Sequence, residues 1–135
     1  QVRTAGGVPD RKGVDDPMIA TGAFFADAVA AVDGKMHVWG GVGDEIHRPA
    51  GVHPMVPIVI LTQASDEPAP DFIDLEILGP DGTRTVVPLG VPEVTKAGKN
   101  QGWFWWRVPI PASVDGRYVA VIGTATIVLH VVTTT

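Results

Sequence analysis

Apolar and polar residues alternate along much of the chain with a period of two, which is typical of half-buried β-strands. The clearest case is DFIDLEIL at residues 71–78, where Ile73, Leu75 and Ile77 alternate with two carboxylates. An antiparallel strand with one face on the core and the other in water has this pattern. We therefore expect residues 71–78 to form such a strand.

Two further stretches depart from simple alternation. The run MVPIVILTQ at residues 55–63 is apolar on both sides, and this favours a strand that is covered on both faces. The alanine-rich stretch AFFADAVAAV at residues 23–32 has the composition of a helix, but Asp33 and Gly34 follow it directly. Both residues tolerate the positive φ of a type I′ turn, so we predict a hairpin around them.

Turn signals divide the rest of the chain into short segments. Pro80-Asp81-Gly82 predicts a turn, Gly123-Thr124 predicts the last hairpin, and the glycine- and proline-rich residues 40–54 predict a loop. This gives about eight strands and no helix. The predicted fold class is therefore all-β, with an antiparallel β-sandwich as the arrangement that buries many one-sided strands.

One tyrosine bears on the topology. Tyr118, in DGRY at residues 115–118, follows a glycine turn and enters the penultimate strand. It resembles the tyrosine corner of immunoglobulin-like sandwiches, in which the hydroxyl bonds to a nearby backbone group. An ordinary strand tyrosine is the alternative, and the corner favours an immunoglobulin-like topology.

The N-terminal segment has a different character. Residues 1–17 show almost no periodicity and contain three glycines and two prolines, which is typical of an arm rather than a core element. We predict an arm over residues 1–18 and one β-sandwich domain over residues 19–135. The arm lies either along its own domain or against a neighbouring copy or partner.

The segment WFWWRVPI at residues 103–110 concentrates three of the four tryptophans. In a strand its residues point alternately to opposite sides. The uniformly apolar side is predicted to be core and consists of Phe104, Trp106, Val108 and Ile110. The other side carries Trp103, Trp105 and Arg107, whose guanidinium can stack on an indole.

Something is expected to cover that second side, because leaving two indoles in water forfeits their burial. The alternatives are the chain's own arm or 40–54 loop, a second copy or another protein, and a sugar or other flat ligand. Aromatic residues with arginine are typical of protein interfaces. A sugar site would need hydroxyl-binding side chains, and only Asn100 and Gln101 are near. We therefore predict Trp103, Trp105 and Arg107 as partner-binding residues.

Three stretches of the sequence together resemble a known family. They are ADAVAAVDGKMHVWGGVGDEI from residue 26, LEILGPDGTR from residue 75, and GRYVAVIG…IVLHV from residue 116. The chain resembles, over residues 19–132, a family of small bacterial β-sandwich proteins known only as a domain of unknown function. Its most specific piece is Asp33-Gly34-Lys35 with Gly40, which are hairpin residues. The resemblance implies a compact β-sandwich and carries over no catalytic residue.

Composition and charge exclude several classes of function. The formal charge is -5 and no basic cluster occurs, so a nucleic-acid partner is not expected. There is no cysteine, which excludes disulfides, thiolate metal sites and cysteine nucleophiles. No window of about 18 apolar residues is present, so we expect no membrane partner. The stretch that begins at Met18 only faintly resembles a signal segment, and a cytoplasmic protein, or one inside a particle, is expected.

Candidate chemistry is sparse. The two serines, Ser65 and Ser113, lie in turn-like sequences without the glycine elbow of a serine hydrolase. His47 and His53 share the 40–54 loop with two carboxylates and could bind a divalent ion, but no rigid third ligand is identifiable. Histidines in such loops are usually solvated, so we predict no metal and no cofactor.

These observations predict a non-enzymatic binding or assembly module. Its contacts with a protein partner or a second copy would involve the Trp103, Trp105 and Arg107 side of the strand and the arm at residues 1–18. One alternative is a carbohydrate- or small-ligand-binding domain that uses the same aromatic side. The other is a metal-dependent enzyme at the 40–54 loop.

Overall fold

The computed structural model describes residues 18–64, 70–96 and 101–134, so the predicted arm up to residue 17 lies outside the described residues. Met18 is already the first residue of a strand. Ten strands occur in the described ranges: β1 Met18–Phe25, β2 Ala28–Val32, β3 Lys35–Trp39, β4 Glu45–Pro49, β5 Met55–Ala64, β6 Phe72–Leu78, β7 Arg84–Gly90, β8 Gln101–Pro109, β9 Gly116–Ile122 and β10 Ala125–Thr134.

The all-β class is confirmed, but the expected number of about eight strands is too low. One reason is that residues 40–54, predicted as a loop, contain β4. A four-residue helix, α1 Glu93–Lys96, also lies in the connection to β8. Within the part of the chain that the structure describes, no helix has the length and apolar character needed to cross a bilayer.

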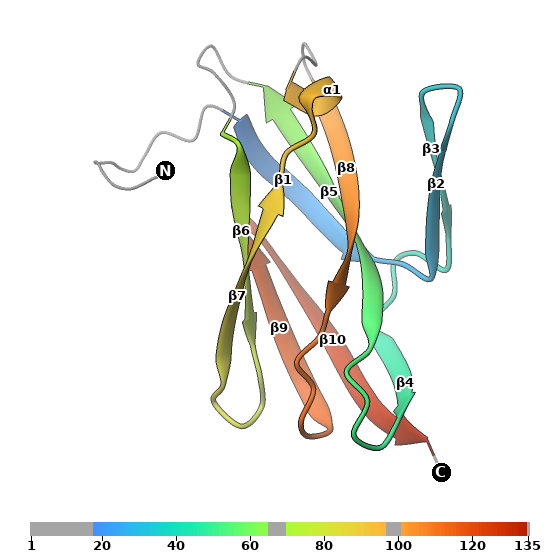
Figure 1. Ribbon diagram of the computed structural model, residues 1–135, viewed down its shortest axis with the longest axis vertical. Helices are drawn as coiled ribbons and strands as arrows, with labels where there is room; N and C mark the ends of the chain where they lie inside the picture. Colours follow the sequence, from blue (N-terminus) through green and yellow to red (C-terminus); the bar gives the residue numbers. More distant parts are fainter. Residues whose placement is uncertain (1–17, 65–69, 97–100, 135) are drawn as a thin grey trace, which may run out of the picture.

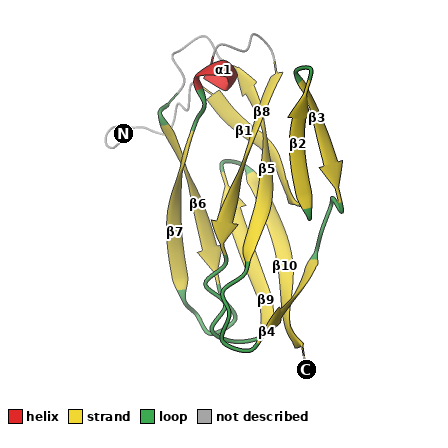
Figure 2. Ribbon diagram, turned by 45° about the vertical axis from the view of Figure 1, so that its right-hand side comes forward, coloured by secondary structure: helices red, strands yellow, loops and turns green. Residues whose placement is uncertain are grey.

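The strands form three sheets (Figures 1 and 2). A three-stranded sheet has the order β1-β5-β8, and a five-stranded sheet has the order β4-β10-β9-β6-β7. The hairpin β2-β3 is a two-stranded sheet of its own, and it stands at the side of the molecule. β4 pairs with β10 in parallel, so the prediction of a wholly antiparallel arrangement is wrong at this pair. Distant chain segments can pair in parallel because the elements between them supply the crossover.

The main core consists of side chains from both larger sheets. Ile58 and Ile60 of β5 pack in one cluster with Leu75 and Ile77 of β6 and with Ile122 of β9, and all five are almost completely buried. The alternation predicted for residues 71–78 is therefore confirmed. The apolar strand predicted at residues 55–63 is covered on both faces only in its middle, where Val59 between these two isoleucines is buried in a second cluster. Met55 and Leu61 on the same face as Val59 are exposed.

Two local predictions are also confirmed. Asp33 and Gly34 have φ values of 53° and 73°, as a type I′ turn requires. The Tyr118 side chain is buried, and its hydroxyl donates a hydrogen bond of 2.7 Å to the carbonyl oxygen of Val114. This bond fixes the start of β9 against the turn that precedes it.

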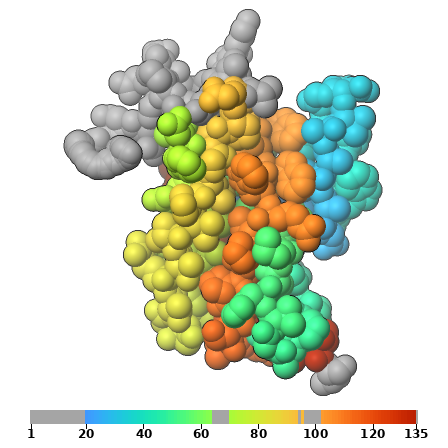
Figure 3. Space-filling model, viewed as in Figure 1, coloured from blue at the N-terminus to red at the C-terminus, as the bar shows by residue number. Residues whose placement is uncertain are grey.

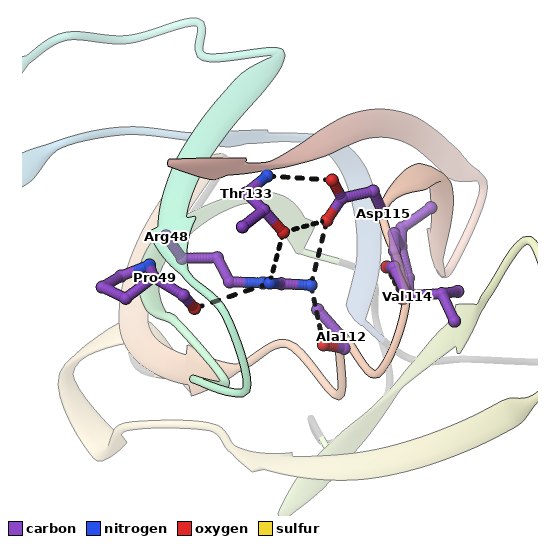
Figure 4. A network of polar contacts seen from close by, with 7 residues as sticks. Arg48, Pro49, Ala112, Val114, Asp115 and Thr133 are labelled. Atoms are coloured by element: carbon purple, nitrogen blue, oxygen red, sulfur yellow. Dashed lines mark hydrogen bonds and ion pairs between the residues drawn. The ribbon is translucent and has the colours of Figure 1, made fainter. Parts of the chain in front are cut away.

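At the end of β4 a buried arginine joins three segments (Figure 4). Arg48 is only 4% exposed, and its guanidinium donates to Thr133 Oγ1 at 2.8 Å and to the Ala112 carbonyl at 3.1 Å. It also lies 3.2 Å from a carboxylate oxygen of Asp115. These contacts connect β4 to β10 and to the segment before β9, so the network anchors the edge of the five-stranded sheet.

The Asp115 carboxylate is fixed by the same network. It accepts a hydrogen bond from the Thr133 hydroxyl at 2.7 Å and another from the Thr133 backbone N–H at 3.0 Å. The hydroxyl bond, then the backbone bond, and last the charge of Arg48 lower the pKa of Asp115 below its ordinary value. The charged form is therefore the one that the fold favours.

Candidate functional site

Strand β8 carries the tryptophan cluster, and its residues point alternately to two sides. Phe104 and Val108 are buried in the main core, as predicted. Trp106 is 44% exposed, so its assignment to the core was wrong. The reason is that β8 is an edge strand, and the Trp106 ring extends past the core to the other sheet. There its Nε1 donates a hydrogen bond of 2.8 Å to the carbonyl oxygen of Gly90.

On the opposite side of β8, Trp105 is half-buried beneath the β2-β3 hairpin. It lies across from Val59 in the strand register, and both belong to the second cluster. From the hairpin, Val29 is buried in this cluster, and Met36 and Val38 pack against it. Among the described residues the hairpin therefore covers Trp105, rather than the 40–54 loop, which was one of the alternatives. The arm, the other candidate from this chain, lies outside the described residues.

The two other predicted residues flank the hairpin. Trp103 is half-buried, and its carbonyl oxygen accepts a hydrogen bond of 2.9 Å from Thr95 of α1. Arg107 is exposed beside Pro57 in the register, and among the described residues it forms no ion pair or cation–π contact. The structure thus places all three predicted residues on one side of β8, with Trp105 already covered between the other two.

The hairpin presents a second aromatic surface to the outside. Trp39 is 55% exposed, and its ring stacks on that of His37 with centroids 6.5 Å apart and an interplanar angle of 28°. The strand register puts Ala28, Ala30 and Val32 of β2 on the same side as Lys35, His37 and Trp39 of β3. We call these six residues the outer hairpin face, and the hairpin forms a ridge at the side of the molecule in Figure 3.

This face was missed in the sequence, although a signal for it exists. In KMHVW, Met36 and Val38 alternate with Lys35, His37 and Trp39, so period two already separates the two sides. The alternation does not say which side is covered. That depends on where the hairpin packs, because Met36 and Val38 are half-buried against the cluster of Ala26, Val29 and Val59.

Exposed apolar side chains continue around this face. Val32 lies on it, and Val42, which is 75% exposed, follows β3 in the connection to β4. Near the hairpin base, a shallow pocket is lined by Phe25, Asp27 and Glu45 among others. The pocket is partly open to solvent, and its lining includes these two carboxylates.

No metal centre is assembled in the described ranges, since no group of three or more His, Cys, Asp or Glu side chains converges there. His47 Nε2 lies 3.5 Å from a carboxylate oxygen of Glu45, and both side chains are exposed. His53 is exposed in the segment after β4. Of the two serines, Ser113 is exposed, whereas Ser65 lies outside the described residues.

No protein-family model matches the chain, and no curated protein or solved structure matches it significantly. The resemblance to a bacterial β-sandwich family therefore stays a prediction. Among the described residues, the outer hairpin face carries an exposed pair of stacked aromatic rings.

Proposed function

We propose that this chain is a non-enzymatic protein-binding or assembly module that makes contact through the outer hairpin face. The single observation that carries the proposal is Trp39, an indole more than half exposed and stacked on His37. Tryptophan is enriched at binding hot spots because it buries a large apolar area with few rotatable bonds. Trp103 and Arg107, on the side of β8 that the hairpin partly covers, are proposed as additional contact residues.

The finer fold belongs to this proposal. We infer an immunoglobulin-like β-sandwich with the hairpin as an addition to it. Support comes from the one core that the two larger sheets share and from the Tyr118 hydroxyl bond. The arm at residues 1–18 is proposed as a second contact element, on the sequence grounds given above.

A protein partner fits the outer hairpin face better than a sugar does. Ala28, Ala30 and Val32 lie beside the aromatic pair, so the surface around Trp39 is apolar. Carbohydrate and other small-molecule sites place polar groups around the stacking ring to fix orientation. An apolar centre with Lys35 at its margin is instead the anatomy of a protein interface.

The proposal is tested by photo-crosslinking in the cells that make the protein. A benzophenone side chain is placed at position 39 and, as a control, at Val86, an exposed residue of β7. We expect protein adducts from position 39 and none from position 86. Equal yields at the two positions, or no adduct at position 39, would contradict the proposal.

The carbohydrate alternative has its own test. Titration of the purified chain with a panel of glycans, followed by tryptophan fluorescence, is expected to leave the emission unchanged. A saturable change that is lost in Trp39→Ala would show ligand binding by this face instead.

A further inference from the structure

We propose that the outer edge of β3 pairs with β3 of a second copy of this chain, antiparallel, about a twofold axis at His37. This inference rests on the proposed function and specifies the partner. In this arrangement the hairpins of the two copies together form one four-stranded sheet with the order β2-β3-β3-β2. The argument follows from the edges of the sheets, from the backbone groups of β3 and from the register.

The strand edges of this fold are not equally protected against pairing. Edge strands commonly carry proline or a bulge, which prevents association with other chains. Of the edge strands in the five-stranded sheet, β4 contains Pro49 and β7 contains Pro88. The edge strand β8 ends in Pro109. β1 has a register shift between Ala20 and Gly22.

β3 has none of these devices. Its sequence, KMHVW, contains no proline, and its pairing with β2 is regular from Lys35 to Trp39. β2 lies on the side toward the body, where it contacts β5, whereas no described strand lies beyond β3 (Figure 2). Among the described strands, β3 therefore presents the free edge that is least protected.

The turn geometry determines which backbone groups of β3 face outward. In a hairpin with a two-residue turn, the residues that flank the turn form a hydrogen-bonded pair, and such pairs alternate with non-hydrogen-bonded pairs. Val32 and Lys35 flank this turn, so the backbone groups of Lys35, His37 and Trp39 point toward β2. The N–H and C=O groups of Met36 and Val38 consequently point away from β2.

A twofold axis at His37 satisfies all four outward groups at once. It places Met36 opposite Val38 of the second copy, and Val38 opposite Met36 of the second copy, as two hydrogen-bonded pairs. Moving the axis to Met36 or to Val38 keeps only one such pair within the strand. A register slip of one residue, which would put the axis midway between two residues, would turn the side chains to the wrong faces.

The same register matches the side chains. Lys35 lies opposite Trp39 of the second copy in a non-hydrogen-bonded pair, where side chains come closest. An ammonium group over an exposed indole makes a favourable cation–π contact, and the symmetry forms it twice. On the inner side, Met36 meets Val38 of the second copy, which extends the apolar cluster around Trp105. The five-residue strand is thus complementary to itself in both faces.

The interface is small, because a five-residue strand and its flanking side chains bury less than about 1,200 Å². We therefore expect a reversible dimer with a Kd on the order of 10 μM. Light scattering on the full chain from about 1 μM to about 1 mM should show a twofold rise in mass. A constant monomer mass over that range overturns the inference.

The register is tested by His37→Asp, which sets two carboxylates directly opposite each other only if the axis passes through His37. Like charges in that position oppose pairing, so we expect the Kd to rise by about tenfold or more. The matched variants are His37→Asn, which has the same size without the charge, and His53→Asp, which adds the same charge elsewhere on the exposed surface. Both should dimerise within about threefold of the original chain. An unchanged Kd in His37→Asp overturns the register.

The use of the backbone edge is tested by Met36→Pro against Met36→Ala. Both remove the methionine side chain, but only proline removes the outward N–H, which β2 does not use. We expect Met36→Pro to abolish the dimer and Met36→Ala to retain it. Amide exchange of the original chain gives a second readout that needs no variant. The amides of Met36 and Val38 should exchange more slowly as the concentration rises, and exchange that does not depend on concentration contradicts edge pairing.

The two proposals fail in distinguishable ways. If the chain stays monomeric but position 39 crosslinks to a different protein, the second-copy inference is wrong and the proposed function holds. If the chain dimerises and Met36→Pro has no effect, the face is used without the edge, and the inference is again wrong. A monomer that gives no adduct at position 39 contradicts both.

Discussion

Residues of one type reach opposite environments in this fold, and the four tryptophans show why. Trp105 and Trp39 both lie on strands whose side chains alternate between two sides, yet Trp105 is half-buried under the hairpin and Trp39 is more than half exposed. Trp106 shares its side of β8 with buried residues and is nevertheless exposed, because the strand lies at a sheet edge. At this scale the surroundings of a side chain, rather than its type, decide whether it is a core residue or a contact residue.

The Asp115 carboxylate gives a residue-scale prediction about pH. Its pKa is lowered in the folded chain by the Thr133 hydrogen bonds and by Arg48, so the charged form stabilises the fold at neutral pH. This stabilisation is present above the ordinary carboxyl pKa near 3.8 and is lost as the pH falls through the lower folded value. The difference in urea midpoint between the original chain and Asp115→Asn should therefore be largest near neutral pH. It should disappear below about pH 4. The difference should shrink in a Thr133→Ala background, and a gap that persists in acid would contradict this account.

At the scale of elements, the β2-β3 hairpin packs against the rest of the molecule through one of its two faces only. Three buried residues, Ala26, Val29 and Val59, form the centre of its contact with the body, and Trp105 packs against them. The outer face contributes nothing to that contact. The hairpin is therefore a separate element attached to the body through one small cluster, and its free side is available to a partner.

This arrangement predicts unequal costs for two tryptophan substitutions. Trp105→Ala removes the ring that fills the space beneath the hairpin and should lower the free energy of unfolding by about 2–4 kcal/mol. Trp39→Ala removes an exposed ring and should change it by less than about 0.5 kcal/mol. Urea unfolding of both variants provides the measurement. Equal losses would mean that the outer ring is also part of the fold.

For the whole molecule, the decisive feature is one core shared by two sheets. Ile58 comes from the three-stranded sheet and Leu75 from the five-stranded sheet, and both are completely buried in the same cluster. Separating the two sheets would therefore expose this cluster to water. The Trp106 bond to Gly90 joins the two sheets, and Arg48 ties the edge of the five-stranded sheet to the segment that follows β8.

The shared core predicts a single cooperative unfolding transition. Ile58→Ala and Leu75→Ala should each lower the free energy of unfolding by about 2–5 kcal/mol. Far-ultraviolet circular dichroism and tryptophan fluorescence should report the same midpoint in each variant, because the sheets unfold together. Val86→Ala on the exposed side of β7 is the control and should cost less than about 0.5 kcal/mol. Two separate transitions would show that the sheets are independent.

Local features of this fold could be predicted where a pattern is complete within a few residues. The alternation at residues 71–78, the turn at Asp33 and Gly34, and the Tyr118 hydroxyl bond all depend on neighbours along the chain. β4 could not be predicted in this way. Its short segment pairs with β10, which lies more than eighty residues away, and the segment EIHRP has no strong pattern of its own.

The sequence by itself determined that this protein is all-β, where most of its strands lie, and which side chains share a side of each of those strands. The period-two alternation, the turn residues and the local hydrogen bonds depend on residues that are near neighbours along the chain. They can therefore be predicted without knowledge of the fold. Only the tertiary structure decided which side is covered. The hairpin folds over Trp105 and leaves Trp39 outside, because burial depends on elements that meet across the molecule, and no short stretch of sequence specifies that meeting.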